Sequence, residues 1–448
     1  MSGAGPSWGI EPVPDRLRVL GLLDTWLLWS NLGISLLVLV SAAYLGLSLK
    51  QAVLATLIGG LVGNTMLAVA ASIGAQARVP TMVLQRAPLG QRGSYLPTTL
   101  NVLQCLGWSV FEIIIIATAA SALSDRVFGF REPWLWKLAM GGVALVLALL
   151  GPVGFVRRFV RKFAAWAVGA SVVYLAWWIL AHGHLDRLWH EGGQGGSFQL
   201  GVDLVIALTV SWIPLVADYT RFSRDGRSAF WGTGLGYLGP TLFQFGFGAV
   251  LVLSHPAIVD PADVLTTVAA GGVASLLALL ALTVDESDEA FANVYSTAVS
   301  LQNLFPRAPQ RLLIVLVSVV ATAGALAVPL TKYPQFLYLL GAFFVPLFGV
   351  LLADWLFAGR RYTEADIFRG PAWRPANVVA WLAGFCVYEW IAQPTGLGFW
   401  TRLVQEVPAA SVQLGASLPS FALAFGLALL AGWLARRGSV QVAAEAPD

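Results

Sequence analysis

Four carboxylates lie within five consecutive residues of a segment that is otherwise apolar. The run is Asp285-Glu286-Ser287-Asp288-Glu289, near the middle of the stretch from Val273 to Leu304. Each ionised group at the centre of a membrane helix costs roughly 2.5 to 3.5 kcal/mol on insertion scales. Four such groups require cations, protons or water, so the run predicts an aqueous pocket or an ion site.

The spacing of the polar residues predicts a helix with one acidic side. At 100° per residue, Asp285 and Glu289 share a stripe, and Glu286 and Asn293 occupy the adjoining one. The alternative is a cytoplasmic turn near 284–290. It is disfavoured because residues 274–305 contain no Pro, Gly, Lys or Arg, and because a loop here would invert every later segment.

A second buried acid belongs to an earlier apolar segment. Gln104, Trp108 and Glu112 recur at i, i+4 and i+8, so that an amide, an indole and a carboxylate share one helix face. An indole can stack on a flat ring while amide and carboxylate groups address its nitrogens. The trio therefore predicts a site for a planar heterocycle. The alternative is a structural role for Glu112 as the cap of an interrupted first helix.

Other motifs carry no chemistry. Gly234 to Gly239 matches GxGxxG, but no strand precedes it, so we expect close helix packing. All four histidines fall in loops, and HExxH, Walker and nucleophile-elbow patterns are missing from the sequence. We therefore expect neither an enzyme nor a cofactor. The net charge of +3 is too small to indicate a nucleic-acid partner.

The composition places these residues in a lipid bilayer. Of 448 residues, 57% are hydrophobic and 11% charged, and the mean hydropathy is +0.74. A soluble domain carries roughly a quarter charged residues. Windows of about 19 residues predict twelve helices, which are Leu20 to Leu45, Ala52 to Ile73, Leu96 to Leu123, Leu135 to Val153, Phe163 to Leu180, Val202 to Tyr219, Phe230 to Ser254, Val273 to Leu304, Leu312 to Val328, Phe336 to Phe357, Val378 to Ile391 and Leu414 to Leu434.

The loops predict an orientation. With the N-terminus inside, twenty of the 27 Lys and Arg residues fall in cytoplasmic segments. The other seven are Lys50, Arg126, Arg131, Lys137, Arg187, Lys332 and Arg402. This asymmetry follows the positive-inside rule and predicts a cytoplasmic-membrane protein with both termini in the cytoplasm. Asp24 is expected near the cytoplasmic end of the first helix, with no assigned role.

Two of the predicted helices are interrupted. The first contains Trp29-Ser30-Asn31-Leu32-Gly33, and the sixth contains Ser211-Trp212-Ile213-Pro214. A break in a membrane helix is tolerated only where it faces protein or a water-filled cavity. Matched breaks in two halves of a chain are typical of transporters with inverted repeats and a binding site at the bilayer midplane. Ordinary Pro and Gly kinks are the alternative.

The sequence resembles the nucleobase:cation symporter-1 family over nearly its whole length. The resemblance rests on three stretches, which are Gly107-Trp108, the run from Pro214 to Phe222 and the run from Ala292 to Thr297. Within the family it is similar to bacterial cytosine permeases. Through residues 284–289 and 300–303 it looks closer to hydroxymethylpyrimidine transporters associated with thiamine salvage.

The resemblance implies an all-α integral membrane fold of twelve transmembrane helices, with two inverted five-helix repeats (LeuT-like) and two C-terminal helices. The implied divisions are a cytoplasmic tail at 1–19, repeats at 20–183 and 198–358, two added helices at 373–436 and a tail at 437–448. It implies that Trp108 and Trp212 sandwich the substrate. The other implied substrate contacts are Asn31, Gln104, Glu112, Ser211 and Asn293.

A cation site is also implied, formed by Ser30 and Gly33 of the first helix with Asp285, Asp288 and Glu289 of the eighth. Cytosine permeases look mostly amide and hydroxyl at these helix-eight positions, whereas this chain has carboxylates. The acids could hold Na⁺, carry protons or pair with a cationic aminopyrimidine; Glu286 is left without a role.

We therefore expect a secondary transporter that imports a pyrimidine by alternating access, coupled to Na⁺ or H⁺, with a hydroxymethylpyrimidine thiamine precursor favoured. The expected partners are a small heterocycle, a monovalent cation and the bilayer. Within transporters, cytosine, another nucleobase or an allantoin-like compound is the alternative. From another class, the alternatives are a non-transporting receptor and a passive channel.

Overall fold

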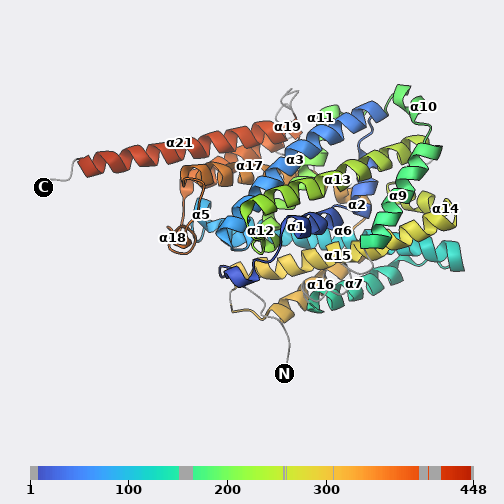
Figure 1. Ribbon diagram of the computed structural model, residues 1–448, viewed down its shortest axis with the longest axis horizontal. Coiled ribbons are helices and arrows are strands. Elements are labelled where there is room, and N and C mark those ends of the chain that lie inside the picture. The colour runs from blue at the N-terminus through green and yellow to red at the C-terminus, as the bar shows by residue number, and fades with distance from the viewer. Residues whose placement is uncertain are drawn as a thin grey trace.

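The computed structural model describes residues 9–150, 165–255, 258, 260–305, 307–392, 402 and 415–444. Their regular structure consists of helices and one isolated bridge between Leu20 and Ser223 (Figure 1). The helices are α1 (Leu22–Leu32), α2 (Leu36–Ser41), α3 (Leu49–Ala77), α4 (Thr81–Leu84), α5 (Arg86–Leu89), α6 (Tyr95–Phe128), α7 (Pro133–Leu150), α9 (Ala165–His182), α10 (Leu185–His190), α11 (Phe198–Val210), α12 (Ile213–Thr220), α13 (Gly226–Ser254), α14 (Ala262–Ala270), α15 (Val273–Leu304), α16 (Gln310–Ala327), α17 (Tyr333–Phe357), α18 (Glu364–Phe368), α19 (Pro375–Ala392) and α21 (Ser417–Ala444), with 3-10 turns η1 (Asp15–Leu17), η2 (Ala42–Tyr44) and η4 (Leu330–Lys332).

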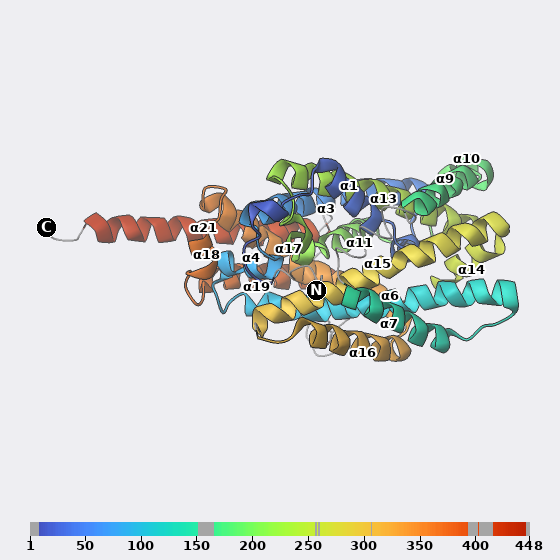
Figure 2. The same cartoon turned by 60° about the horizontal axis from the view of Figure 1, so that its bottom comes forward.

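The long helices run roughly along the longest axis of the molecule (Figure 1). The short helices α5 and α18 lie toward one end of the bundle, and α10 and α14 lie toward the other (Figures 1 and 2). Among the described residues, seven helices are long and apolar enough to span a membrane, or eight when the bent pair of α1 with α2 and η2 is counted as one span. Twelve spans were predicted, so the full count stays a prediction.

Each of the twelve predicted segments nevertheless coincides with helical structure. The ends predicted at Val153, Phe163 and Leu414 lie outside the described residues. α15 is one helix from Val273 to Leu304, so the alternative of a turn near residue 287 is wrong. The sequence reading missed α14, a nine-residue helix that ends just before two glycines.

A break in the first helix is confirmed, but it begins only at Gly33, because the predicted residues Trp29 to Leu32 still belong to α1. α1 ends at Leu32, α2 begins at Leu36, and the two segments are bent by 54°. Ser35 caps α2, because its side chain accepts a hydrogen bond from the backbone N–H of Leu37. Gly33 is needed here, since a Cβ at that position would lie 2.9 Å from Cβ of Pro240 in α13.

The second predicted break is local. α11 ends at Val210 and α12 begins at Ile213, with Pro214 in the first turn of α12, where its missing N–H costs no hydrogen bond. Residues 198–220 still run as a single span, without the sharp bend seen between α1 and α2. The expectation of two equally broken helices is therefore corrected: Ser211 and Trp212 interrupt the helix without redirecting it.

The GxGxxG run packs helices together, as the sequence indicated. A Cβ at Gly236 would lie 2.8 Å from the carbonyl oxygen of Trp26 and 3.0 Å from Cβ of Trp29, both in α1. One at Gly234 would lie 2.9 Å from Cβ of Ala68 in α3. These glycines let α1 and α3 approach the backbone of α13, and this close packing holds the broken first helix in place.

Candidate functional site

Three glutamates from two helices meet inside the bundle. Glu112 of α6 and Glu286 and Glu289 of α15 each place a carboxylate oxygen within 4.8 Å of the other two. The three residues are 0%, 1% and 4% exposed. Two unit charges 4.8 Å apart repel by about 3 kcal/mol at an effective dielectric constant of ~20. This glutamate cluster is therefore strained unless positive charge or protons offset it.

Glu286 caps α2, the second half of the broken first helix. Its Oε2 accepts from the backbone N–H of Leu36 at 2.6 Å, and its Oε1 accepts from the Ser35 hydroxyl at 2.8 Å and the Leu37 N–H at 3.4 Å. These donors include backbone groups that a helix start leaves unpaired. The alternative role considered for Glu112, capping the interrupted helix, thus belongs to Glu286.

Glu112 faces the cluster without such partners. Within the described part of the chain, neither of its carboxylate oxygens has a hydrogen-bond partner. The sequence supplies no Lys or Arg at 19–49, 93–125, 188–220 or 228–306, so α1, α2, α11, α12 and α15 and nearly all of α6 and α13 lack a basic side chain. The protein therefore does not neutralise the cluster from these helices.

The predicted cation ligands are only partly brought together. Glu289 belongs to the cluster, and Asp285 is buried at 3% exposed. The side chain of Asp288 lies outside what the structure describes. Ser30 has a buried hydroxyl with no partner among the described residues, and Gly33 begins the break. Hydroxyl, carbonyl and carboxylate oxygens are donors that a hard cation prefers, so the donor set fits Na⁺ chemically.

Trp108 lies in an aromatic group between α6 and α17. Its ring is 5.7 Å from Tyr333 and 5.5 Å from Phe336, both edge-on. Gly107 allows this contact, because a Cβ there would lie 2.6 Å from the Phe336 ring. Trp108 precedes Glu112 by one helical turn, so this aromatic group is adjacent to the glutamate cluster along α6.

Trp212 belongs to a different aromatic group. Its indole N–H donates to the Tyr237 hydroxyl at 2.8 Å, and its ring centroid is 5.7 Å from that of Trp29. The two predicted stacking partners, Trp108 and Trp212, therefore belong to separate groups. The sandwich stays a prediction.

The remaining predicted substrate contacts are the polar residues Gln104, Ser211, Asn293 and Asn31. Gln104 donates from Nε2 to the Ser211 carbonyl and to Asn101 Oδ1, each at 2.9 Å, which ties α6 to the second interruption. Asn293 donates to the Glu289 carbonyl at 3.1 Å. Asn31 is buried at 7% exposed. Gln104 and Ser211 thus meet each other, and Asn293 lies one turn from the cluster.

Sequence reasoning missed several residues around this site. Tyr333, Phe336, Tyr237 and Trp29 line the two aromatic groups, and Glu286 had no assigned role. Trp29 is the first residue of the predicted break, which is a usable signal. Asp24 accepts from the Gly21 N–H at 3.1 Å and so helps to cap α1.

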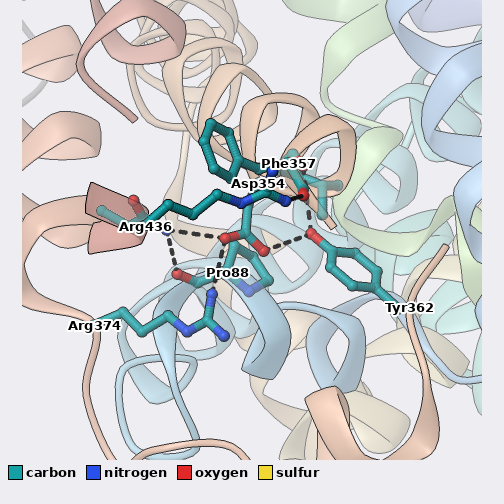
Figure 3. Close-up of polar contacts among 8 residues, drawn as sticks. Pro88, Asp354, Phe357, Tyr362, Arg374 and Arg436 are labelled. Carbon is teal, nitrogen blue, oxygen red and sulfur yellow. Dashed lines mark hydrogen bonds and ion pairs between the residues drawn. The ribbon is translucent and has the colours of Figure 1, made fainter. Parts of the chain in front are cut away.

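A second polar network links α17 to residues that follow it in the chain (Figure 3). Asp354 of α17 accepts from Arg374 at 2.9 Å and from the Tyr362 hydroxyl at 2.9 Å. Burial and the neighbouring Asp354 carboxylate raise the pKa of Tyr362 well above its ordinary value, so it stays a donor. Arg436 of α21 donates to the Phe357 carbonyl at 2.5 Å. The network connects α17 to the loop residues Tyr362 and Arg374, and we interpret its role as structural.

Comparison with known proteins decides the family. Residues 12–415 match the family described as permeases for cytosine/purines, uracil, thiamine and allantoin. The chain belongs to this family, nucleobase:cation symporter-1. It is accordingly a secondary transporter of the membrane and not an enzyme.

Individual members of the symporter family are distant relatives. The chain is 26% identical over 394 residues to a hydantoin permease of Microbacterium maritypicum, covering 81% of this chain and 79% of that one. It is 25% identical over 350 residues to the cytosine permease of Escherichia coli (strain K12), covering 77% and 80%. It is 23% identical over 361 residues to the allantoin permease of Bacillus subtilis (strain 168), covering 72% of each.

Solved structures show the fold. The inward-facing conformation of Mhp1 superposes with a TM-score of 0.75 at 19% identity, covering 96% of this chain and 94% of that one. Mhp1 in a closed conformation with bromovinylhydantoin bound gives 0.74 at 21% identity, covering 98% and 97%. The transporter described here thus has the LeuT-type fold that the sequence resemblance implied.

Proposed function

We propose that this symporter imports a planar pyrimidine, with a hydroxymethylpyrimidine precursor of thiamine favoured, driven by a Na⁺ or H⁺ gradient. The observation that carries the proposal is the glutamate cluster, buried beside the break between α1 and α2 and one helical turn from Trp108. In transporters of this kind, substrate and ions bind where a helix is interrupted. The cluster lies at such an interruption, and its carboxylates can bind a cation or a proton.

The proposed substrate contacts follow from the same geometry. The indole of Trp108 offers a flat surface, and Glu112, Gln104 and Asn293 offer acceptors and donors for ring nitrogens and an exocyclic amine. Trp212, Ser211 and Asn31 would complete the site on the side of the interruptions. The relatives named for hydantoin, cytosine and allantoin also act on planar or amide-rich heterocycles, which supports the substrate class.

The proposed coupling follows from charge balance. A cation bound near Ser30, Gly33, Asp285, Asp288 and Glu289 would offset the repulsion within the cluster. A cation and a substrate that bind so close together strengthen each other's affinity by the same factor. Cation entry from outside would therefore raise substrate affinity on that side, and loss of the cation inside would release the substrate.

Uptake into proteoliposomes tests this function. A panel of labelled hydroxymethylpyrimidine, cytosine, uracil, hydantoin and allantoin would be offered with Na⁺ and pH gradients imposed separately. The proposal expects gradient-driven accumulation of a pyrimidine. Accumulation of hydantoin or allantoin alone would move the substrate to the alternative class. Equilibration without a gradient would indicate a channel, and absence of flux a receptor.

A further inference from the structure

The repulsion within the glutamate cluster must be offset by protons or by positive charge, and a neutral substrate brings no positive charge. Glu112, Glu286 and Glu289 hold their carboxylate oxygens within 4.8 Å of one another, and all three are buried. Glu286 accepts hydrogen bonds in each of its contacts with Ser35, Leu36 and Leu37, a role that suits the ionised form. A neutral ring placed beside the cluster would leave this negative charge in place.

Among the three glutamates, Glu112 gives the strongest indication of a bound ligand. It is 0% exposed, and within the described residues both of its oxygens lack hydrogen-bond partners. A buried carboxylate without partners bears a large desolvation cost unless a ligand supplies the donor. Since the surrounding helices carry no Lys or Arg at this depth, the donor does not come from a basic side chain on them.

The aromatic surroundings favour the same kind of ligand. Trp108 lies one turn before Glu112 and makes edge-on ring contacts with Tyr333 and Phe336. Aromatic faces attract cations, and the attraction grows when water is excluded. An indole one helical turn from an unpartnered carboxylate therefore suits a ring that is both flat and positively charged.

We propose that Glu112 receives a cationic nitrogen of the substrate, and that this symporter selects positively charged N-heterocycles over neutral ones of the same size. The proposal rests on the proposed function and deepens it by naming the charge of the substrate. The coupling cation would then occupy the separate oxygen set on α1 and α15. A metal ion at Glu112 is the other possible source of the positive charge, and the experiment distinguishes the two.

The test compares a permanently charged ring with a neutral one at a single pH. Purified full-length protein in proteoliposomes would be tested for competition of labelled pyrimidine uptake by 4-amino-1-methylpyrimidinium and by cytosine, at saturating and at zero Na⁺. The wild type is expected to prefer the pyrimidinium at least tenfold. Glu112→Gln should reduce this preference to about one.

Two variants separate charge from folding. Glu112→Asp keeps the carboxylate and should keep most of the preference for the cation. Glu132→Gln makes the same chemical change at an exposed residue beyond the end of α6, and should leave both affinities unchanged. Size-exclusion profiles and apparent unfolding temperatures would confirm that each variant is folded.

The outcomes are distinct. If the wild type transports heterocycles but binds cytosine as well as the pyrimidinium, the charge selectivity is refuted while the proposed function stands. An unchanged preference in Glu112→Gln refutes the assignment to Glu112. Cytosine binding that requires Na⁺ and loses this requirement in Glu112→Gln would assign the positive charge to a metal ion and overturn the proposal. Absence of any heterocycle binding overturns the proposed function as well.

Discussion

Replacing Glu286 with glutamine separates the two jobs of this side chain, capping α2 and adding charge to the glutamate cluster. The amide keeps one oxygen that can accept an N–H, and replaces the other oxygen with a donor that would face Ser35 or Leu36. The lost hydrogen bonds to a charged group cost about 1.5 to 3 kcal/mol. Removing the repulsion from Glu112 and Glu289, about 3 kcal/mol for each ionised pair, offsets this loss, so we expect a folded protein that is not destabilised.

The cation affinity is expected to change much more. A bound cation within about 5 Å of Glu286 gains about 3 kcal/mol from its charge at an effective dielectric constant of ~20. Losing that attraction corresponds to a drop in affinity of roughly a hundredfold. Ser35→Ala is the matched control, because it removes a donor to the same carboxylate but leaves every charge in place. We expect it to change the cation affinity less than about threefold.

Initial rates of uptake into proteoliposomes provide the readout. They would be measured against Na⁺ concentration at fixed pH, and against pH at fixed Na⁺. The half-saturating concentration of the coupling cation should rise about a hundredfold in Glu286→Gln and stay near the wild-type value in Ser35→Ala. The reasoning is refuted by equal half-saturating concentrations in Glu286→Gln and wild type, or by equal losses in the two variants.

Three further changes have defined outcomes. Gly236→Ala should lower the apparent unfolding temperature in detergent, because the new Cβ would lie 2.8 Å from a carbonyl oxygen of α1 and overpacking costs about 1 to 3 kcal/mol. Gly239→Ala is the control and should leave this temperature unchanged, because its Cβ would meet nothing within 4 Å. Equal unfolding temperatures of the two variants would contradict the packing argument. Asp354→Asn should destabilise the protein by about 1 to 3 kcal/mol, because Arg374 loses its ionic partner, and should leave the KM for substrate unchanged. A changed KM with an unchanged unfolding temperature would show that the Asp354 network acts in transport. Asp288→Asn should alter the Na⁺ or pH dependence of uptake, and identical ion dependence would remove this residue from the cation site.

The order of helices was predictable from sequence, because long apolar runs in a bilayer have few structural options. An interruption of the first helix near Gly33 was also predictable, since polar residues and a glycine inside an apolar run are costly unless the helix opens there; its exact place was not, because Ser30 to Leu32 remain helical. The missed helix α14 is short, and its sequence lacks the long apolar run on which the prediction depended.

The partners of the site residues were not predictable. Glu286 and Ser35 are separated by 251 positions, and no local pattern links them. Helical periodicity placed Asp285 with Glu289, whereas the structure groups Glu286 and Glu289 with Glu112. Asp285 and Glu286 are adjacent in the sequence, and Glu289 lies about one helical turn from both. The packing of α6 against α15 therefore decides which of them faces Glu112.

Transport driven by a cation gradient is the central claim. The most direct measurement is accumulation of a labelled pyrimidine in proteoliposomes with an imposed Na⁺ or pH gradient, for wild type and Glu112→Gln side by side. We predict uphill accumulation by the wild type that collapses when the gradient is removed and is strongly reduced in the variant. Equal internal and external concentrations regardless of gradient, or full accumulation by Glu112→Gln, would contradict it.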